Sequence, residues 1–211
     1  MRQTTLVVMV KEPRPGRVKT RLGRSIGMVA AAWWFRHQVT RLLRRIDDPR
    51  WRLVLAVSPD AEGLTSRVWP ARLPRVPQGT GNLGDRMGRL LRSLPPGPVC
   101  IIGADIPGIT RAHIARAFAA LGNHDAVIGP APDGGYWLIG LRRSAAVPAR
   151  IFDGVRWSSA HARADTIRSL GAARVALIDT LRDVDEARDL NPASARIPIA
   201  KSLPALRRPP R

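Results

Sequence analysis

The 211-residue chain contains a single cysteine, Cys100, which lies among apolar neighbours. One cysteine cannot form an internal disulfide or a cysteine-based zinc site, and such sparing use is typical of a reducing compartment. The apolar stretch near the N-terminus ends at Lys11, so it is too short for the hydrophobic segment of a secretory signal. We therefore expect a cytoplasmic protein with an inert core thiol.

Long apolar runs are also missing. No stretch of about 18 uninterrupted apolar residues could cross a bilayer, so insertion is excluded and no membrane partner is expected. The length suits one core, because single cores grow to roughly 250 residues before chains split into domains. We expect one domain over residues 1–190 and a Pro/Arg-rich tail over residues 191–211.

Lysine is scarce, since only Lys11, Lys19 and Lys201 contribute to the 35 Lys and Arg residues. The 16 Asp and Glu residues leave a formal net charge of +19, which makes a nucleic-acid-binding protein one alternative. GC-rich codon usage also produces such an arginine excess, and we expect no specific nucleic-acid partner. The four histidines show no metal-ligand spacing, and the Gly-x-Ser-x-Gly elbow of serine hydrolases is missing.

Short apolar runs alternate with amphipathic stretches along most of the chain. The expected strands are Leu6–Val10, Arg52–Val57, Val99–Gly103, Ala126–Gly129, Trp137–Leu141 and Val175–Ile178. The expected helices are Met28–Ile46, Leu83–Leu94, Thr110–Leu121 and Ser159–Leu170. This alternation predicts an α/β fold, in which a doubly wound, mostly parallel, Rossmann-like sheet lies between two layers of helices.

A basic loop, residues 11–21, follows the first expected strand directly. Ligands collect at the carboxyl ends of strands in open α/β sheets, so a cationic loop there suits a phosphate or pyrophosphate. Gly16 would let the backbone approach the ligand, while Lys11, Lys19 and Arg21 could neutralise its oxygens. The alternative is a solvated basic turn.

A glycine-rich segment, Gln78–Met87, precedes the second expected helix. Gly79, Gly81 and Gly84 permit positive φ and could bring backbone amides to a ligand at the helix N-terminus. A structural turn is the alternative interpretation, because the segment lacks the Lys-Ser/Thr ending of a P-loop.

Carboxylates follow two expected strands. Asp105 comes directly after Val99–Gly103, and Asp183 and Asp185 follow the last strand. Mg²⁺ takes one or two protein carboxylates and completes its octahedron with water and substrate phosphates, so these residues could hold a divalent cation together. Alternatively, Asp105 supports a turn, and Asp185 lies in the first turn of an N-capped helix, where an acid suits the helix dipole.

The segment Asp133-Gly-Gly-Tyr136 connects two expected strands. Gly134 and Gly135 could allow close backbone contact with a substrate, and Asp133 could accept a proton from an acceptor hydroxyl. A plain hairpin turn uses the same residues.

Six blocks together resemble the nucleotide-diphospho-sugar transferase-like family of small GT-A-fold proteins, often labelled arsenosugar-biosynthesis glycosyltransferases. The blocks, which fall between residues 4 and 190, are Lys11–Leu22, Gln78–Met87, Gly103–Gly108, Gly129–Leu141, Trp157–Ser158 and the Asp-Val-Asp of residues 183–185. The chain also resembles, more distantly, phospholactate guanylyltransferase, whose first strand similarly leads into Lys and then Lys-x-Arg-Leu.

The resemblance implies a nucleotide or nucleotide-sugar ligand, a small-molecule acceptor and Mg²⁺ or Mn²⁺. It implies that Lys11, Lys19 and Arg21 face phosphates and that residues 78–84 lie near the base and ribose. Asp105 with Asp183 or Asp185 would hold the metal, and residues 133–136 would border the acceptor. Trp157 and Ser158 belong to a matching block and join the expected substrate site. Asn82 departs from the family pattern, which has Asp there, and an amide cannot supply that carboxylate's charge.

We therefore predict a metal-dependent transferase that uses a nucleotide-activated donor, with glycosyl transfer favoured over nucleotidyl transfer. Asp133 and Lys19 are the expected catalytic residues. Two further alternatives are a basic nucleic-acid-binding protein and a family member that binds a nucleotide without turning it over. The sequence leaves the base, the sugar, the acceptor and the oligomeric state open.

Overall fold

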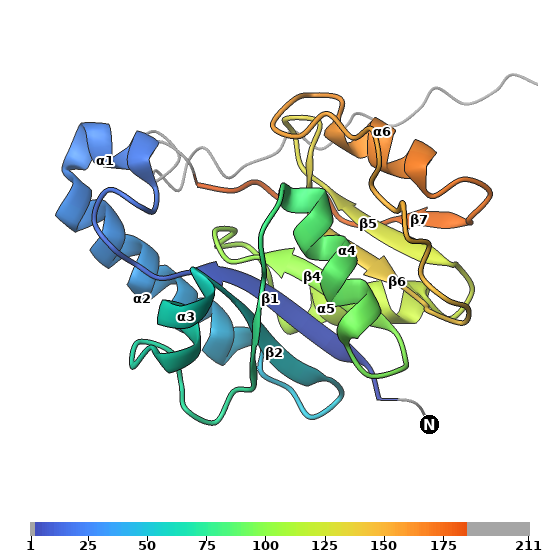
Figure 1. Cartoon of the computed structure of the whole chain (residues 1–211), viewed down its shortest axis with the longest axis horizontal. Helices are drawn as coiled ribbons and strands as arrows, with labels where there is room; N and C mark the ends of the chain where they lie inside the picture. The colour runs from blue at the N-terminus through green and yellow to red at the C-terminus, as the bar shows by residue number, and fades with distance from the viewer. Residues whose placement is uncertain (1–2, 185–211) are drawn as a thin grey trace, which may run out of the picture.

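The computed structural model describes residues 3–184, which form a seven-stranded sheet covered by helices (Figure 1). The strands are β1 (Thr5–Lys11), β2 (Arg52–Ser58), β3 (Arg75–Pro77), β4 (Val99–Gly103), β5 (Ala126–Pro130), β6 (Tyr136–Leu141) and β7 (Val175–Leu177). The helices are α1 (Thr20–Ile26), α2 (Met28–Ile46), α3 (Asp60–Thr65), α4 (Leu83–Ser93), α5 (Arg111–Ala120) and α6 (Ala162–Ser169). The strand order is β3-β2-β1-β4-β6-β5-β7, and β6 runs antiparallel to both of its neighbours.

Helices cover both faces of the sheet, because alternate residues of each buried strand point to opposite sides. Leu6, Val8 and Val10 of β1 belong to a core that includes side chains of α2 and α5. Val7, between them, belongs to a second core formed with α4, against which α6 also packs through Ile167. The expected three-layer α/β/α architecture with a mostly parallel sheet is confirmed.

The longest helix matches its sequence-based range from Met28 to Ile46, because Phe35, Val39 and Leu42 recur at helical spacing and are buried. The sequence did not predict β3, α1 or α3. These elements have three, seven and six residues, which is too short for a periodic pattern to show. No helix within residues 3–184 combines the length and apolarity needed to cross a bilayer.

The topology brings several chain segments to one edge of the sheet. β1 and β4 are parallel neighbours, so Lys11 and Gly103 both lie at their carboxyl ends. The reversed strand β6 begins at this edge, where Tyr136 pairs with Pro130 at the end of β5. The loops that follow β1, β4 and β5 therefore meet at one rim.

Candidate active site

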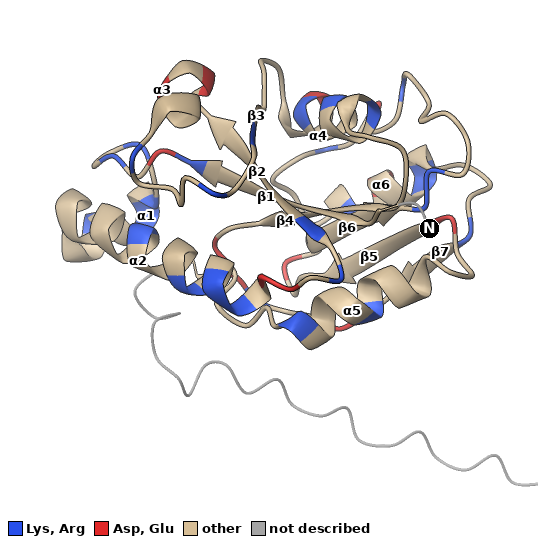
Figure 2. Cartoon of the chain, turned by 90° about the horizontal axis from the view of Figure 1, so that it is seen from below, with Lys and Arg blue, Asp and Glu red and all other residues tan. Residues whose placement is uncertain are grey.

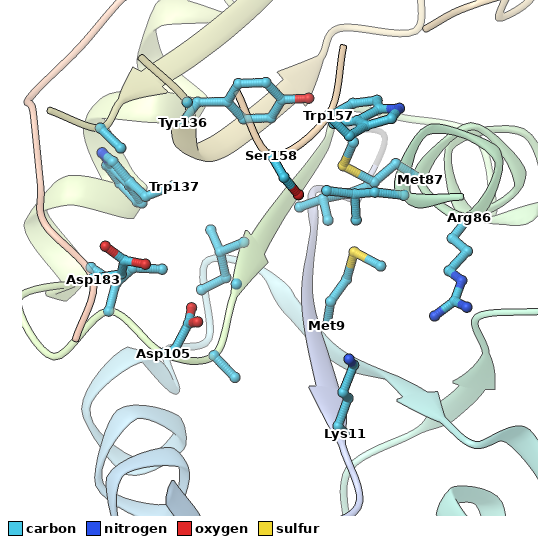
Figure 3. Close-up of a pocket in the computed structure, with 18 of the residues that line it drawn as sticks. Met9, Lys11, Arg86, Met87, Asp105, Tyr136, Trp137, Trp157, Ser158 and Asp183 are labelled. Carbon is cyan, nitrogen blue, oxygen red and sulfur yellow. The ribbon is translucent and has the colours of Figure 1, made fainter. Parts of the chain in front are cut away.

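A cavity of about 780 Å³ lies at this rim (Figure 3), a size in the range usual for small-molecule sites. Its apolar part includes Met9, Met87 and Trp137. Figure 3 shows Asp105 and Asp183 on one side of Met9 and Arg86 on the other, with Lys11 next to Met9, and all five residues line the cavity. The cavity thus presents carboxylates and cations from separate segments to the same space.

The basic loop supplies Lys11, Lys19 and Arg21 to the cavity lining, while exposed Gly16 lies outside it. Lys19 has a left-handed backbone conformation, with φ 46°, immediately before α1. Its side chain is only 6% exposed, and Nζ donates to Asp105 Oδ2 at 2.8 Å. The lysine expected to face phosphate therefore also contacts the carboxylate expected to bind metal.

The two described candidate metal ligands come from segments 78 positions apart in sequence that touch in space. The backbone N–H of Val184 donates to the carbonyl oxygen of Asp105 at 3.3 Å, and both Asp105 and Asp183 line the cavity. The third candidate, Asp185, lies outside the described residues. Across residues 3–184 no group of three or more His, Cys, Asp and Glu side chains could enclose a metal. Two carboxylates that line one cavity are nevertheless the donor set that Mg²⁺ or Mn²⁺ takes when water and substrate oxygens complete its shell.

Gln78 ties the glycine-rich segment to the sheet. It is buried, and its side-chain amide donates to the carbonyl oxygens of Val10 and Ala56 at 3.1 and 2.7 Å. The Asp60 carboxylate accepts from the backbone N–H groups of Gln78 and Gly79. Gln78 also lines the cavity, whereas Gly79 does not.

Asn82 forms the N-terminal cap of α4. Its side chain accepts from the backbone N–H of Asp85 at 3.0 Å, and the Asp85 carboxylate accepts from the backbone N–H of Asn82 at 2.9 Å. Capping requires only an acceptor oxygen, which Asn provides as well as Asp does. The departure from the family pattern therefore keeps the helix start while removing a charge from the cavity wall.

The glycines of Gln78–Met87 and of Asp133–Tyr136 have different roles. Gly81 and Gly135 line the cavity, whereas Gly84 and Gly134 have structural reasons to be glycine and lie outside the lining. A Cβ on Gly84 would come within 2.8 Å of the Trp157 ring, and one on Gly134 would overlap the backbone of Ala160. Gly134 also has φ +87°, which disfavours other residues.

The opposite wall carries the segment expected to border the acceptor. Asp133 lines the cavity, and its Oδ1 accepts from the backbone N–H of Gly135 at 2.9 Å. The Tyr136 hydroxyl accepts from Thr166 Oγ1 at 3.3 Å, and burial raises the pKa of this phenol, which stays protonated at neutral pH. Its ring meets Trp157 edge to face at 6.4 Å.

Trp157 and Ser158 line the cavity, and the preceding residue, Arg156, is fixed by hydrogen bonds to Asp165. Both the backbone N–H and Nε of Arg156 donate to Asp165 Oδ2, the latter at 2.7 Å. Asp165 is buried on α6, and its hydrogen bonds with Arg156 hold the pKa of its carboxyl well below the ordinary value. Asp165 thus positions the segment that carries Trp157 and Ser158.

Several residues that line the cavity were not predicted from the sequence. Met9 could have been found, because it lies two positions before Lys11 on the same strand and so shares its face. Arg86 could also have been found, since it falls one helical turn after Asn82. Asp60 and Asp165 support lining segments from distant elements, and no local pattern marks them.

The fold and this rim define an α/β protein of the nucleotide-diphospho-sugar transferase-like class. A solved structure from Desulfovibrio desulfuricans G20, provisionally described as a nucleotide-diphospho-sugar transferase, is 31% identical with a TM-score of 0.80. The match covers 90% of this chain and 85% of that one. The resemblance noted from the sequence is confirmed.

The chain belongs to the family described as "Uncharacterized protein conserved in bacteria (DUF2064)", whose model matches residues 42–159. A comparison with curated proteins found no match. Two more distant structures share the fold. The 4-diphosphocytidyl-2C-methyl-D-erythritol synthase of Anaerococcus prevotii is 10% identical (TM-score 0.55, covering 89% of this chain and 93% of that one). Rv0371c of Mycobacterium tuberculosis in complex with manganese is 15% identical (TM-score 0.52, covering 90% and 96%).

Proposed function

We propose that the chain is a metal-dependent transferase acting on a nucleotide-activated donor, with a nucleotide-sugar as the favoured donor. The observation that carries the proposal is the meeting of Asp105 and Asp183 with Lys11 and Arg86 in one cavity at the carboxyl ends of β1 and β4. Ligands of open α/β sheets bind at this edge. The neighbouring structures support a nucleotide-using transferase, because they include a protein described as a sugar transferase and a cytidylyl-transfer enzyme.

Asp105 and Asp183 would hold Mg²⁺ or Mn²⁺, and Asp185 stays a third candidate. When bound, such a cation stabilises the negative charge that develops on the leaving phosphate. Lys11, Lys19, Arg21 and Arg86 would bind phosphate oxygens and orient the donor. Gln78, Gly81 and Asn82 line the same cavity and would contact the base and ribose.

The acceptor would lie against Asp133, Gly135, Tyr136 and Trp157. The hydrogen bond from Gly135 N–H orients the Asp133 carboxylate, which could then take the proton of an acceptor hydroxyl as it attacks. The neutral Tyr136 phenol and the Trp157 ring offer an aromatic surface beside it. Apolar side chains of Met9 and Met87 would restrict water near the reacting groups.

Nucleotidyl transfer is the second candidate, since the chain shares its fold with cytidylyl-transfer enzymes. Both reactions use the same electrostatic groups and differ in the bond that breaks. Glycosyl transfer releases a nucleoside diphosphate, and nucleotidyl transfer releases pyrophosphate.

A donor panel tests the proposal. The full chain is first screened by thermal shift against nucleotides and nucleotide-sugars with and without Mg²⁺. Donors that bind are then incubated with sugar and phosphosugar acceptors, and the by-product is identified. Nucleoside diphosphate supports the proposal, pyrophosphate supports the second candidate, and no metal-dependent stabilisation by any donor contradicts both. Asp105→Asn serves as the control that should lose the metal dependence while remaining folded.

A further inference from the structure

A patch of exposed apolar side chains lies at the junction of α1 and α2, away from the cavity. It consists of Ile26, Met28, Val29 and Trp33, which we call the α1–α2 tip. Val29 and Trp33 are 69% and 64% exposed, the highest values among the large apolar residues within the described part of the chain. A hollow of about 710 Å³ borders the same residues and Trp34. In Figure 1 the two helices project beyond the sheet at one end of the molecule.

The same outward face of α2 continues into a basic surface. Val29, Trp33, Arg36 and Arg44 follow helical spacing and are all exposed. Arg41 borders the hollow beside them. Neither Arg36, Arg41 nor Arg44 has a carboxylate partner among the side chains of residues 3–184. The helix thus carries an apolar end and a cationic end on one side.

Acidic residues are absent from this part of the sequence. Residues 13–46 contain eight arginines and Lys19 but neither Asp nor Glu. Figure 2 agrees, since α1 and α2 show basic positions and no acidic one. A partner must therefore be negatively charged and must also cover apolar side chains.

We propose that the α1–α2 tip docks onto an anionic lipid surface, with Val29 and Trp33 entering the headgroup region and Arg36, Arg41 and Arg44 facing the lipid phosphates. A second copy of the chain fits poorly, because two such faces would bring like charges together in a protein of formal net charge +19. A nucleic acid satisfies the arginines but leaves the aliphatic side chains of Ile26, Met28 and Val29 without an apolar environment. A lipid interface satisfies both, and tryptophan is enriched at such interfaces.

Docking in this way would hold the cavity near the lipid surface. Thr20 begins α1 and lines the cavity, and Arg17 and Arg21 line it from either side of that residue. The tip is therefore linked to the candidate active site by a single short helix. Peripheral contact of this kind needs no membrane-spanning segment. The proposal therefore departs from the sequence-based expectation of no membrane partner, which rested on the missing apolar runs alone.

Vesicle co-sedimentation of the full chain tests the proposal. Vesicles of phosphatidylcholine alone are compared with vesicles containing phosphatidylglycerol, at two salt concentrations. We expect binding to the anionic vesicles only, weakening with salt. The double variant Val29→Ser/Trp33→Ser, which keeps every charge, should lose at least about tenfold in partitioning. Leu177→Ser, at an exposed position on edge strand β7, is the matched control and should bind as the native chain does.

A second pair of variants separates charge from apolar contact. Arg36→Gln/Arg44→Gln should lower partitioning by roughly 25-fold, because each basic residue near an anionic surface contributes about fivefold. Arg52→Gln/Arg67→Gln, which removes two exposed charges elsewhere, should reduce it much less. The proposal is overturned if the two arginine pairs lose the same amount of partitioning. It is also overturned if the native chain does not bind anionic vesicles. A sedimentation experiment in which the native chain dimerises without lipid and Val29→Ser/Trp33→Ser makes it monomeric overturns it as well.

Discussion

Lys19 and Asp105 form an ion pair in the cavity, at the position where the proposed function needs both residues for a ligand. The pair is 2.8 Å long, and the lysine side chain is far less exposed than the carboxylate. An ammonium group there supplies positive charge to Asp105 before any metal binds. A divalent cation that binds Asp105 must therefore share this carboxylate with Lys19 or displace the lysine. A ligand phosphate, in contrast, could contact Lys19 while the ion pair stays intact.

Replacing Lys19 should separate these two effects. Lys19→Met removes the competing ammonium, so we expect roughly fivefold tighter binding of Mn²⁺ alone, about 1 kcal/mol for a partly solvated charge pair. The same variant should bind nucleoside triphosphates more weakly and nucleosides unchanged. Calorimetric titrations with each of the three ligands measure both effects.

Lys11→Met is the matched lysine control for this experiment. Lys11 lines the cavity at the end of β1, so its loss should weaken triphosphate binding while leaving the affinity for Mn²⁺ alone nearly unchanged. If both lysine variants shift Mn²⁺ affinity equally, the contact with Asp105 is not what sets metal binding.

At the scale of elements, the hairpin between β5 and β6 depends on Gly134. The residue has φ +87°, and a Cβ there would overlap the backbone of Ala160. We expect Gly134→Ala to lower the free energy of unfolding by roughly 2 to 5 kcal/mol, from backbone strain and steric overlap together. Gly171 also has positive φ, but a Cβ there would meet open space, so we expect Gly171→Ala to lower the free energy of unfolding by only about 1 to 2 kcal/mol. Denaturant unfolding measures both, and equal losses would contradict the overlap.

Helix α6 holds the Trp157 segment through Asp165, whose carboxyl pKa is lowered chiefly by its hydrogen bond with Arg156. A lowered folded-state pKa means that the carboxylate stabilises the fold fully above its unfolded pKa, about 3.9. This contribution disappears as the pH falls through the folded value. Asp165→Asn should therefore unfold more easily than the native chain at pH 7, and the difference should shrink below about pH 4.

Thermal unfolding between pH 7 and pH 3 measures this effect. Asp153→Asn is the control, because that carboxylate is exposed and pairs with exposed Arg150. It should change stability little at any pH. A difference between Asp165→Asn and the native chain that stays constant down to pH 3 would contradict the role given to Asp165.

Sequence patterns predicted the long elements well because buried strands and amphipathic helices repeat their apolar residues. The α2 range matched at both ends for this reason. The apolar run of β6 does not reveal its reversal, since a buried antiparallel strand shows the same run as a parallel one. The signal lies in the short Asp133-Gly-Gly link, for which a hairpin turn was one of the two interpretations. Candidate lining residues could be named from the sequence where they lie near a strand end or a helix start, as Lys11, Asp105 and Asn82 do. Gly84 and Gly134 leave no room for a Cβ because Trp157 and Ala160 pack against them. These neighbours lie far away in sequence, so no local pattern predicts the contacts.

At the scale of the whole molecule, the described residues form two hydrophobic cores, whose side chains come from positions between Leu6 and Leu181. Residues 191–211, the Pro/Arg-rich tail expected from the sequence, lie outside the described residues, and we propose that they contribute little to folding. A chain that ends at residue 190 should therefore melt within about 2 °C of the full chain, a difference that corresponds to at most about 1 kcal/mol at this length. Calorimetry checks this, and a fall of several degrees would show that the tail packs against the domain.

The single reversed strand has a consequence for how relatives could diverge. Adjacent parallel strands need a long crossover, but β5 and β6 are joined by five residues, 131–135, at the binding rim. This short link can change length or composition without disturbing the helices that connect the other strands. A new acceptor preference could thus arise by altering one tight turn, while the half of the sheet that would receive the donor stays as it is.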